Sequence, residues 1–227
     1  MKLWNSSKLV VAIAVVFAVV LSIGVAQASN MGFKMNRVIQ PLGTPSPKGQ
    51  NQVALPFKNP YSTAQDVCDA LGLSNVAPKG KVSYVNASTG TTSSHNCGDA
   101  GPFALTARQG LIVNNNTAAG GIVVGSHQAN PPGTISLIGL ATPAPKGQNR
   151  FPVPYHTTAV NAQDLCVDLG LPSPSNGKIQ RIDASSGVTS SHNCGDAGAF
   201  NLVLGEAVII TFTGATINVP TGHPAHF

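Results

Sequence analysis

Two identical nine-residue segments, 93–101 and 190–198, contain the residues of this chain best suited to chemistry. Each reads Ser-Ser-His-Asn-Cys-Gly-Asp-Ala-Gly, which brings hydroxyls, an imidazole, a thiol and a carboxylate close together. Imidazole, thiolate and carboxylate groups bind metal ions. A hydroxyl, an imidazole and a carboxylate in hydrogen-bonded series form a nucleophile with its base. The segments therefore raise two hypotheses, a metal site and a hydrolytic site.

A metal site would use alternate residues, because His95, Cys97 and Asp99 share one side of an extended segment. This spacing matches no standard metal motif, and cysteines of exported proteins usually pair with each other. The chain also has no Cys-x-x-Cys-His motif for covalent haem. We expect no metal and no other cofactor. The candidate ligands for the opposing hypothesis are His95, Asp99, His192 and Asp196.

A hydrolytic site would take its serine, histidine and aspartate from one loop, whereas known triads combine separate parts of a fold. The chain has a single glutamate, Glu206, so carboxylates for acid and base pairs are scarce. The simpler interpretation gives Asp99 and Asp196 a role in turns beside glycines, and it gives the histidines hydrogen bonds to the backbone. We expect a protein that is not an enzyme, with a hydrolase as the alternative.

The four cysteines predict one disulfide in each half of the chain. The spacing from Cys68 to Cys97 nearly equals that from Cys166 to Cys194. If each half folds by itself, pairing within the halves is the simplest of the three connectivities. Each bridge would join a short helix to the histidine loop and would stabilise its half by about 3 kcal/mol through loop closure.

The chain is an internal duplication with a period of about 98 residues. Residues 47–51 recur at 145–149, and the cysteine, histidine and aspartate positions recur in the same order. This period is long enough for each half to own a core. We predict module 1 over residues 29–133 and module 2 over 134–227, joined at the Pro-Pro-Gly of 131–133.

The first 28 residues are typical of a signal peptide. Lys2 and Lys8 precede an apolar run over 9–21, and the Ala-Gln-Ala of 26–28 fits a cleavage site. An uncleaved membrane anchor is the alternative, although the run is short for a membrane span. We expect a cleaved product without a membrane span that is secreted, periplasmic or at the cell surface.

Charged residues are scarce. The chain has 13 Lys and Arg against 8 Asp and Glu, with a net charge of +5. Cleavage would remove two of the lysines, and no basic cluster remains that could bind phosphates. We therefore do not expect nucleic acid as a partner.

The hydrophobic pattern predicts a mainly β protein with one short helix per module. Helices are expected over 63–71 and 161–169, each followed by a glycine. Proline-containing edge strands are expected over 52–57 and 150–155. Further strands are expected over 81–86, 178–183, 122–124 and 217–219, and 103–113 and 200–212 should each form two strands around a turn. Each module should be a small sandwich or barrel.

Four elements resemble a module of uncharacterised exported tandem-module proteins from environmental Gram-negative bacteria. They are the Asn-Met-Gly-Phe-Lys-Met-Asn start at 30–36, the Asn-x-x-x-x-Pro-aromatic strands at 51–57 and 149–155, the Ala-x-Asp-hydrophobic-Cys helix, and the Gly-Glu-Ala-Val of 205–208. Module 1 departs from the pattern with Arg-Gln-Gly at 108–110. The resemblance implies the architecture and no reaction, cofactor or substrate.

These observations favour a structural or interaction protein, with a carbohydrate-binding or metal-binding surface module as the alternative. The only tryptophan, Trp4, lies in the predicted signal peptide, so sugar rings could stack only on tyrosines and phenylalanines. Self-association could use the strand at 31–36, where Met31, Phe33 and Met35 share one side. Pairing of this strand within its own module is the favoured alternative.

Overall fold

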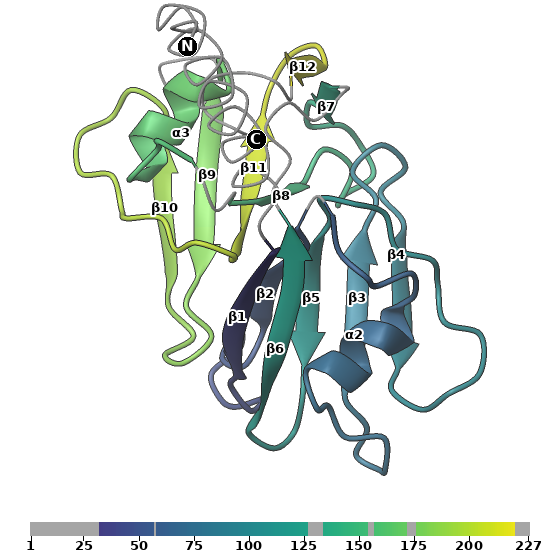
Figure 1. Cartoon of the computed structure of the whole chain (residues 1–227). Coiled ribbons are helices and arrows are strands. Elements are labelled where there is room, and N and C mark those ends of the chain that lie inside the picture. The colour runs from purple at the N-terminus through teal and green to yellow at the C-terminus, as the bar shows by residue number, and fades with distance from the viewer. Residues whose placement is uncertain (1–31, 57, 127–133, 154–156, 172–175, 221–227) are drawn as a thin grey trace, which may run out of the picture.

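The chain folds as two modules of antiparallel strands, each with one short helix (Figure 1). This computed structural model describes residues 32–56, 58–126, 134–153, 157–171 and 176–220. The predicted signal peptide, Met31 and the predicted junction at 131–133 lie outside these ranges. In the described part of the chain, no helix is long and apolar enough to cross a membrane.

Module 1 combines a four-stranded sheet with a two-stranded sheet. The four-stranded sheet has the order β2-β5-β3-β4, and β1 pairs with β6. The elements are β1 (Gly32–Ile39), β2 (Asn51–Ala54), α2 (Ala64–Ala70), β3 (Lys81–Val85), β4 (Thr92–Asn96), β5 (Gly110–Asn114) and β6 (Ala119–Ser126).

Module 2 repeats this topology with the sheets β8-β11-β9-β10 and β7-β12. Its elements are β7 (Thr134–Leu137), β8 (Asn149–Pro152), α3 (Ala162–Asp168), β9 (Gly177–Ile182), β10 (Thr189–Asn193), β11 (Ala207–Phe212) and β12 (Ile217–Pro220). The predicted fold class, two small β modules in tandem with one helix each, is confirmed.

Each module has a hydrophobic core of its own between its two sheets and its helix. In module 1, Ile39 of β1, Val67 of α2 and Leu111 of β5 are at most 2% exposed. In module 2, Leu165 and Phe212 are buried to the same degree. Burial of such side chains contributes about 1.5–3 kcal/mol each, so both cores contribute to the stability of the fold.

Both helices begin and end where local signals predict. Thr63 caps α2 and Asn161 caps α3. In each helix, the carboxylate of an aspartate three residues later accepts a hydrogen bond from the backbone N–H of the capping residue. The backbone hydrogen bond from Thr63, followed by bonds from Ser62, lowers the pKa of Asp66. Each helix is followed by a glycine with φ near +60°, a conformation that disfavours side chains.

Two expectations about strands are wrong. The repeated segment was expected to be a loop, yet its Ser-Ser-His-Asn residues belong to the edge strands β4 and β10. Residues 103–113 and 200–212 each contain one strand, β5 and β11, rather than two. In module 1, the first half of this region instead runs beside the start of the helix, where Ala64 N donates to Phe103 O and Leu105 N donates to Ser62 O.

A buried asparagine joins the two sheets in each module. The Asn51 side chain accepts from Gln40 N at 2.8 Å and donates to Gln40 O, Gly49 O and Val113 O at 2.9–3.0 Å. Asn149 makes the equivalent four bonds in module 2. One amide therefore satisfies backbone groups from the end of β1 or β7, the following turn and the central strand.

We predict that Asn51→Ala lowers the free energy of unfolding by at least about 3 kcal/mol, because several buried backbone groups lose their partner together. Asn149→Ala should cost a similar amount in module 2. Denaturant unfolding measures both effects. The exposed Asn116→Ala is the matched control, and a loss for Asn51→Ala no larger than that of the control would contradict this role.

Candidate functional site

His95, the first candidate for chemistry, belongs to β4. Its side chain is buried and bonds to a side chain of α2. Its Nε2 lies 2.8 Å from Oε1 of Gln65, and the same oxygen accepts from Gly98 N at 2.8 Å. Gln65 Oε1 is a carbonyl oxygen, which can only accept hydrogen bonds. His95 Nε2 therefore carries the proton and donates it in a hydrogen bond to this oxygen. His95 therefore connects the edge strand to the helix.

Module 2 repeats this arrangement. His192 Nε2 lies 2.8 Å from Gln163 Oε1, which accepts from Gly195 N at 2.7 Å. The expectation that the histidines bond to the backbone is wrong, because their partner is a glutamine side chain of the helix. This glutamine was not predicted from the sequence, although its repetition within Ala-Gln-Asp-hydrophobic-Cys was a visible signal.

The predicted disulfides, Cys68–Cys97 and Cys166–Cys194, are confirmed. Their Cα atoms are 5.7 and 5.6 Å apart, in the ordinary range for a disulfide. Each bridge leaves the same helix as the glutamine, so a covalent bond and a hydrogen-bonded histidine hold each helix to its edge strand.

Asp99 and Asp196 lie at the turn that follows the edge strand. Asp99 pairs with Lys79 and accepts from Asn96 Nδ2 at 3.0 Å, while Asp196 accepts from Asn193 Nδ2 at 2.9 Å. The hydrogen bond from Lys79, and then the one from Asn96, lowers the pKa of Asp99. These turn bonds match the simpler interpretation of the aspartates.

The structure does not bring the candidate residues together as a catalytic or metal-binding set. Cys97 is in a disulfide, the His95 ring bonds to Gln65, and Ser94 Oγ lies 3.0 Å from Ser83 Oγ. Within the described ranges, no group of three His, Cys, Asp or Glu side chains could hold a metal ion. Their geometry therefore supports a role in holding the module together.

The two modules meet around an approximate twofold axis. Gly49 N of module 1 donates to Ala184 O of module 2 at 2.8 Å, and the equivalent Gly147 N donates to Ala87 O at 2.8 Å. Two equivalent residues also bond to each other across this axis, with Arg150 Nη1 at 2.5 Å from Gln52 Oε1. The modules thus contact each other as two subunits of a symmetric dimer would.

The modules also approach each other closely at Gly110 and its equivalent, Ala207. A Cβ atom on Gly110 would lie 2.8 Å from the Ala207 Cβ and 2.7 Å from Arg150 O, both too close for real contacts. This approach therefore requires glycine at one of the two equivalent positions.

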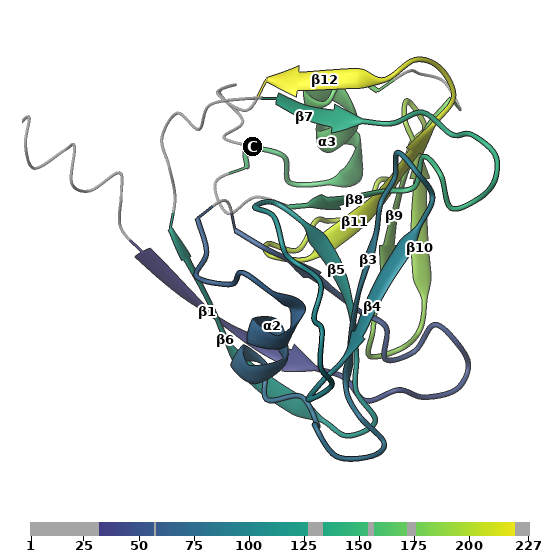
Figure 2. The ribbon, with the colours of Figure 1, turned by 90° about the vertical axis from the view of Figure 1, so that its right-hand side faces the viewer.

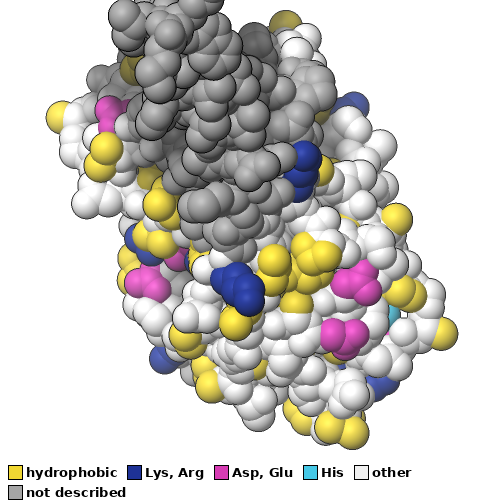
Figure 3. All heavy atoms as spheres, viewed as in Figure 1, with side chains coloured by type: hydrophobic (Ala, Val, Ile, Leu, Met, Phe, Trp, Pro, Cys, Tyr) yellow, Lys and Arg dark blue, Asp and Glu magenta, His cyan; other side chains and the backbone are white. Residues whose placement is uncertain are grey.

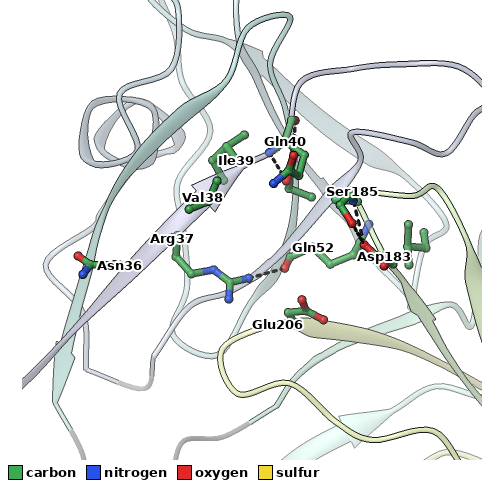
Figure 4. A pocket seen from close by; sticks show the side chains of 12 residues that line it. Asn36, Arg37, Val38, Ile39, Gln40, Gln52, Asp183, Ser185 and Glu206 are labelled. Carbon is green, nitrogen blue, oxygen red and sulfur yellow. Dashed lines mark hydrogen bonds between the residues drawn. The ribbon is translucent and has the colours of Figure 1, made fainter.

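A polar cavity of about 180 Å³ lies beside this contact and takes its walls from both modules (Figure 4). Arg37 of β1 donates to Gln52 O at 3.1 Å, and across the cavity Glu206 accepts from Arg181 Nε at 2.7 Å. Asp183 completes the charged lining, and its pKa is lowered by hydrogen bonds from the Ser185 side chain and then the Ser185 backbone. This cavity was not predicted from the sequence.

Two buried polar groups near the cavity have incomplete hydrogen bonding. Within the described ranges, Gln52 Nε2 and Arg150 Nε have no hydrogen-bond partner. Burial also lowers the pKa of Arg150 to about 10. On the surface shown in Figure 3, basic side chains lie scattered, without a continuous basic patch. With Gln52 Nε2 as a donor and the Asp183 and Glu206 carboxylates as acceptors, the cavity can offer both kinds of group to a small polar molecule.

Comparison of the chain with protein-family models, with curated proteins and with solved structures finds no match.

We predict that replacing both histidines, His95→Asn and His192→Asn, lowers the free energy of unfolding by about 1–2 kcal/mol per module, the value of a buried hydrogen bond. The melting temperature of the intact chain should be the same with and without a chelator. Calorimetry and elemental analysis measure the two quantities. One zinc or copper ion per module, lost in the double variant, would restore the metal hypothesis.

We also predict that Gly110→Val lowers stability by about 1–3 kcal/mol, because the added side chain overlaps Ala207 and the Arg150 carbonyl. Melting curves measure the loss, and small-angle scattering should show a larger radius as the modules move apart. Ala207→Gly, which adds no volume at the same contact, is the control. An unchanged radius and melting temperature for Gly110→Val would contradict the observed approach.

Proposed function

We propose that this chain is an exported structural or interaction protein, not an enzyme, built on two disulfide-linked β modules. The arrangement around His95 carries this proposal. The side chains that chemistry would need are used in holding the helix to the sheet, and module 2 uses them in the same way.

We further propose that the protein works outside the cytoplasm, secreted, in the periplasm or at the cell surface. Two disulfides form and persist in an oxidising compartment. The signal-peptide pattern of residues 1–28 gives independent support from the sequence.

Self-association is the interaction that we favour. The sequence suggested the N-terminal strand with Met31, Phe33 and Met35 as its element, or as a strand of its own module. The described part of this strand, β1, pairs along its whole length with β6 of the same chain. Our proposal therefore places self-association at sheet edges that have no partner in the described part of the chain.

A small polar ligand in the cavity between the modules is the second candidate. The observation in its favour is the buried Gln52 Nε2, a donor beside the cavity without a partner in the described part of the chain. Sugar stacking has less support at Tyr61, because its side chain is partly buried and packs against the core of module 1.

The two candidates predict different behaviour of purified residues 29–227. Sedimentation velocity should show oligomers that grow with protein concentration in the absence of any added small molecule. A chain that stays monomeric, and whose melting temperature rises with a sugar, amino acid or polyol, would contradict self-association and support the ligand-binding alternative.

A further inference from the structure

The outermost strands of the two four-stranded sheets are β4 and β10. Each pairs on one side only, β4 with β3 and β10 with β9. They lie on opposite sides of the molecule, β10 beyond β9 and β4 beyond β3 (Figures 1 and 2). An edge strand presents unpaired backbone groups that can accept another strand.

The register shows which backbone groups point outward. Cys97 N donates to Gly80 O and Asn86 N donates to Thr91 O, both at 2.9 Å, at the two ends of the β3–β4 pair. Because hydrogen-bonded pairs alternate along an antiparallel ladder, Ser93 and His95 face β3. The backbone groups that face outward therefore belong to Thr92, Ser94 and Asn96.

The same alternation holds in module 2. Cys194 N donates to Gly177 O and Asp183 N donates to Val188 O, both at 2.9 Å. The outward groups of β10 therefore belong to Thr189, Ser191 and Asn193. Asn96 O and Asn193 O accept from the turns that follow, but in the described ranges the other outward groups have no partner.

Three other edge strands in the described part of the chain, β2, β6 and β8, are partly closed. On β2, Gln52 O accepts from Arg37 and Ala54 N donates to Gly205 O of the other module. On β6, the Tyr61 hydroxyl donates to the outward Ile122 O and accepts from the outward Val124 N. On β8, Pro152 has no N–H. Compared with these three strands, β4 and β10 leave more outward backbone groups without a partner in the described ranges.

The two available edges have one sequence. Both read Thr-Ser-Ser-His-Asn and contain neither a proline nor a lysine or other charged side chain of the kind that commonly blocks edge pairing. The internal contacts of each module explain the histidine, the cysteine and the turn that follows. They do not explain why Thr92 and Ser93, which are exposed, recur unchanged in module 2.

We propose that the Thr-Ser-Ser-His-Asn edge strand of one molecule pairs antiparallel with the same edge strand of a second molecule of this chain. Ser94 would exchange two backbone hydrogen bonds with its counterpart on the neighbour. The amide of Asn96 would donate to the outward threonine carbonyl of the neighbouring strand, and the reciprocal bond would form at the other end. Because each molecule has two such edges on opposite sides, pairing produces a linear assembly.

This inference rests on the proposed self-association and specifies the surface involved. Because the two edges are identical, β4 can pair with either edge of a neighbour. A molecule with one blocked edge should therefore form dimers through its remaining edge, and a molecule with both edges blocked should stay monomeric.

The test compares residues 29–227 with variants at Ser94 and Ser191 by sedimentation velocity over rising protein concentration. Ser94→Pro removes an outward N–H and adds a ring at the edge, and it breaks no backbone hydrogen bond to β3. It does remove the bond between Ser94 Oγ and Ser83 Oγ of β3, which Ser94→Ala removes as well. The expected results are linear oligomers for the intact chain, dimers for Ser94→Pro and monomers for Ser94→Pro with Ser191→Pro.

The matched control is Ser94→Ala with Ser191→Ala, which keeps both amides and should still form oligomers. Intact disulfides and a cooperative melting transition show that each variant is folded. Oligomers that persist unchanged in the folded double-proline variant would overturn the edge inference while leaving self-association itself intact. A monomeric intact chain would overturn both the inference and the proposed self-association.

Discussion

The approximate twofold contact between the modules determines most of what this molecule presents to its surroundings. Where Gly110 meets Ala207 and Gln52 meets Arg150, the strands β2 and β8 become internal. Because these strands lie at one end of their sheets, the opposite ends, β4 and β10, must face outward. The same contact creates the polar cavity, whose walls come from both modules. Both candidate functions therefore depend on how the duplicated modules pack.

The same contact gives a physical reason for one difference between the modules. Alanine at both 110 and 207 would put two Cβ atoms about as close as the 2.8 Å calculated for Gly110, so one position must be glycine. At 205, glycine also leaves room for Met35, whose sulfur would lie 2.6 Å from an added Cβ. Arg108, the equivalent of Gly205, has a φ of 60°, a conformation that costs a non-glycine residue about 1–2 kcal/mol. The segments 108–110 and 205–207 thus differ where the two modules meet.

Much of the fold could be predicted from sequence because its signals are local. The capping residues Thr63 and Asn161 predict the starts of the helices, and the repeated cysteine spacing predicts the disulfides. The partner of His95 could not be predicted, because Gln65 is thirty residues away and only the disulfide-linked packing of helix and strand joins them. The cavity could not be predicted from the sequence of either module alone, because Glu206 and Gln52 come together only where the modules meet.

Hydrogen exchange of individual amides tests most directly whether the outward edges are the interaction surface. In dilute solution, the amides of Ser94 and Ser191 should exchange rapidly, while those of Ser93 and His95, which face β3, should be protected. At high protein concentration, the Ser94 and Ser191 amides should become protected while the rest of the pattern stays the same. Rapid exchange of Ser94 and Ser191 at every concentration, in a solution that contains oligomers, would contradict this account.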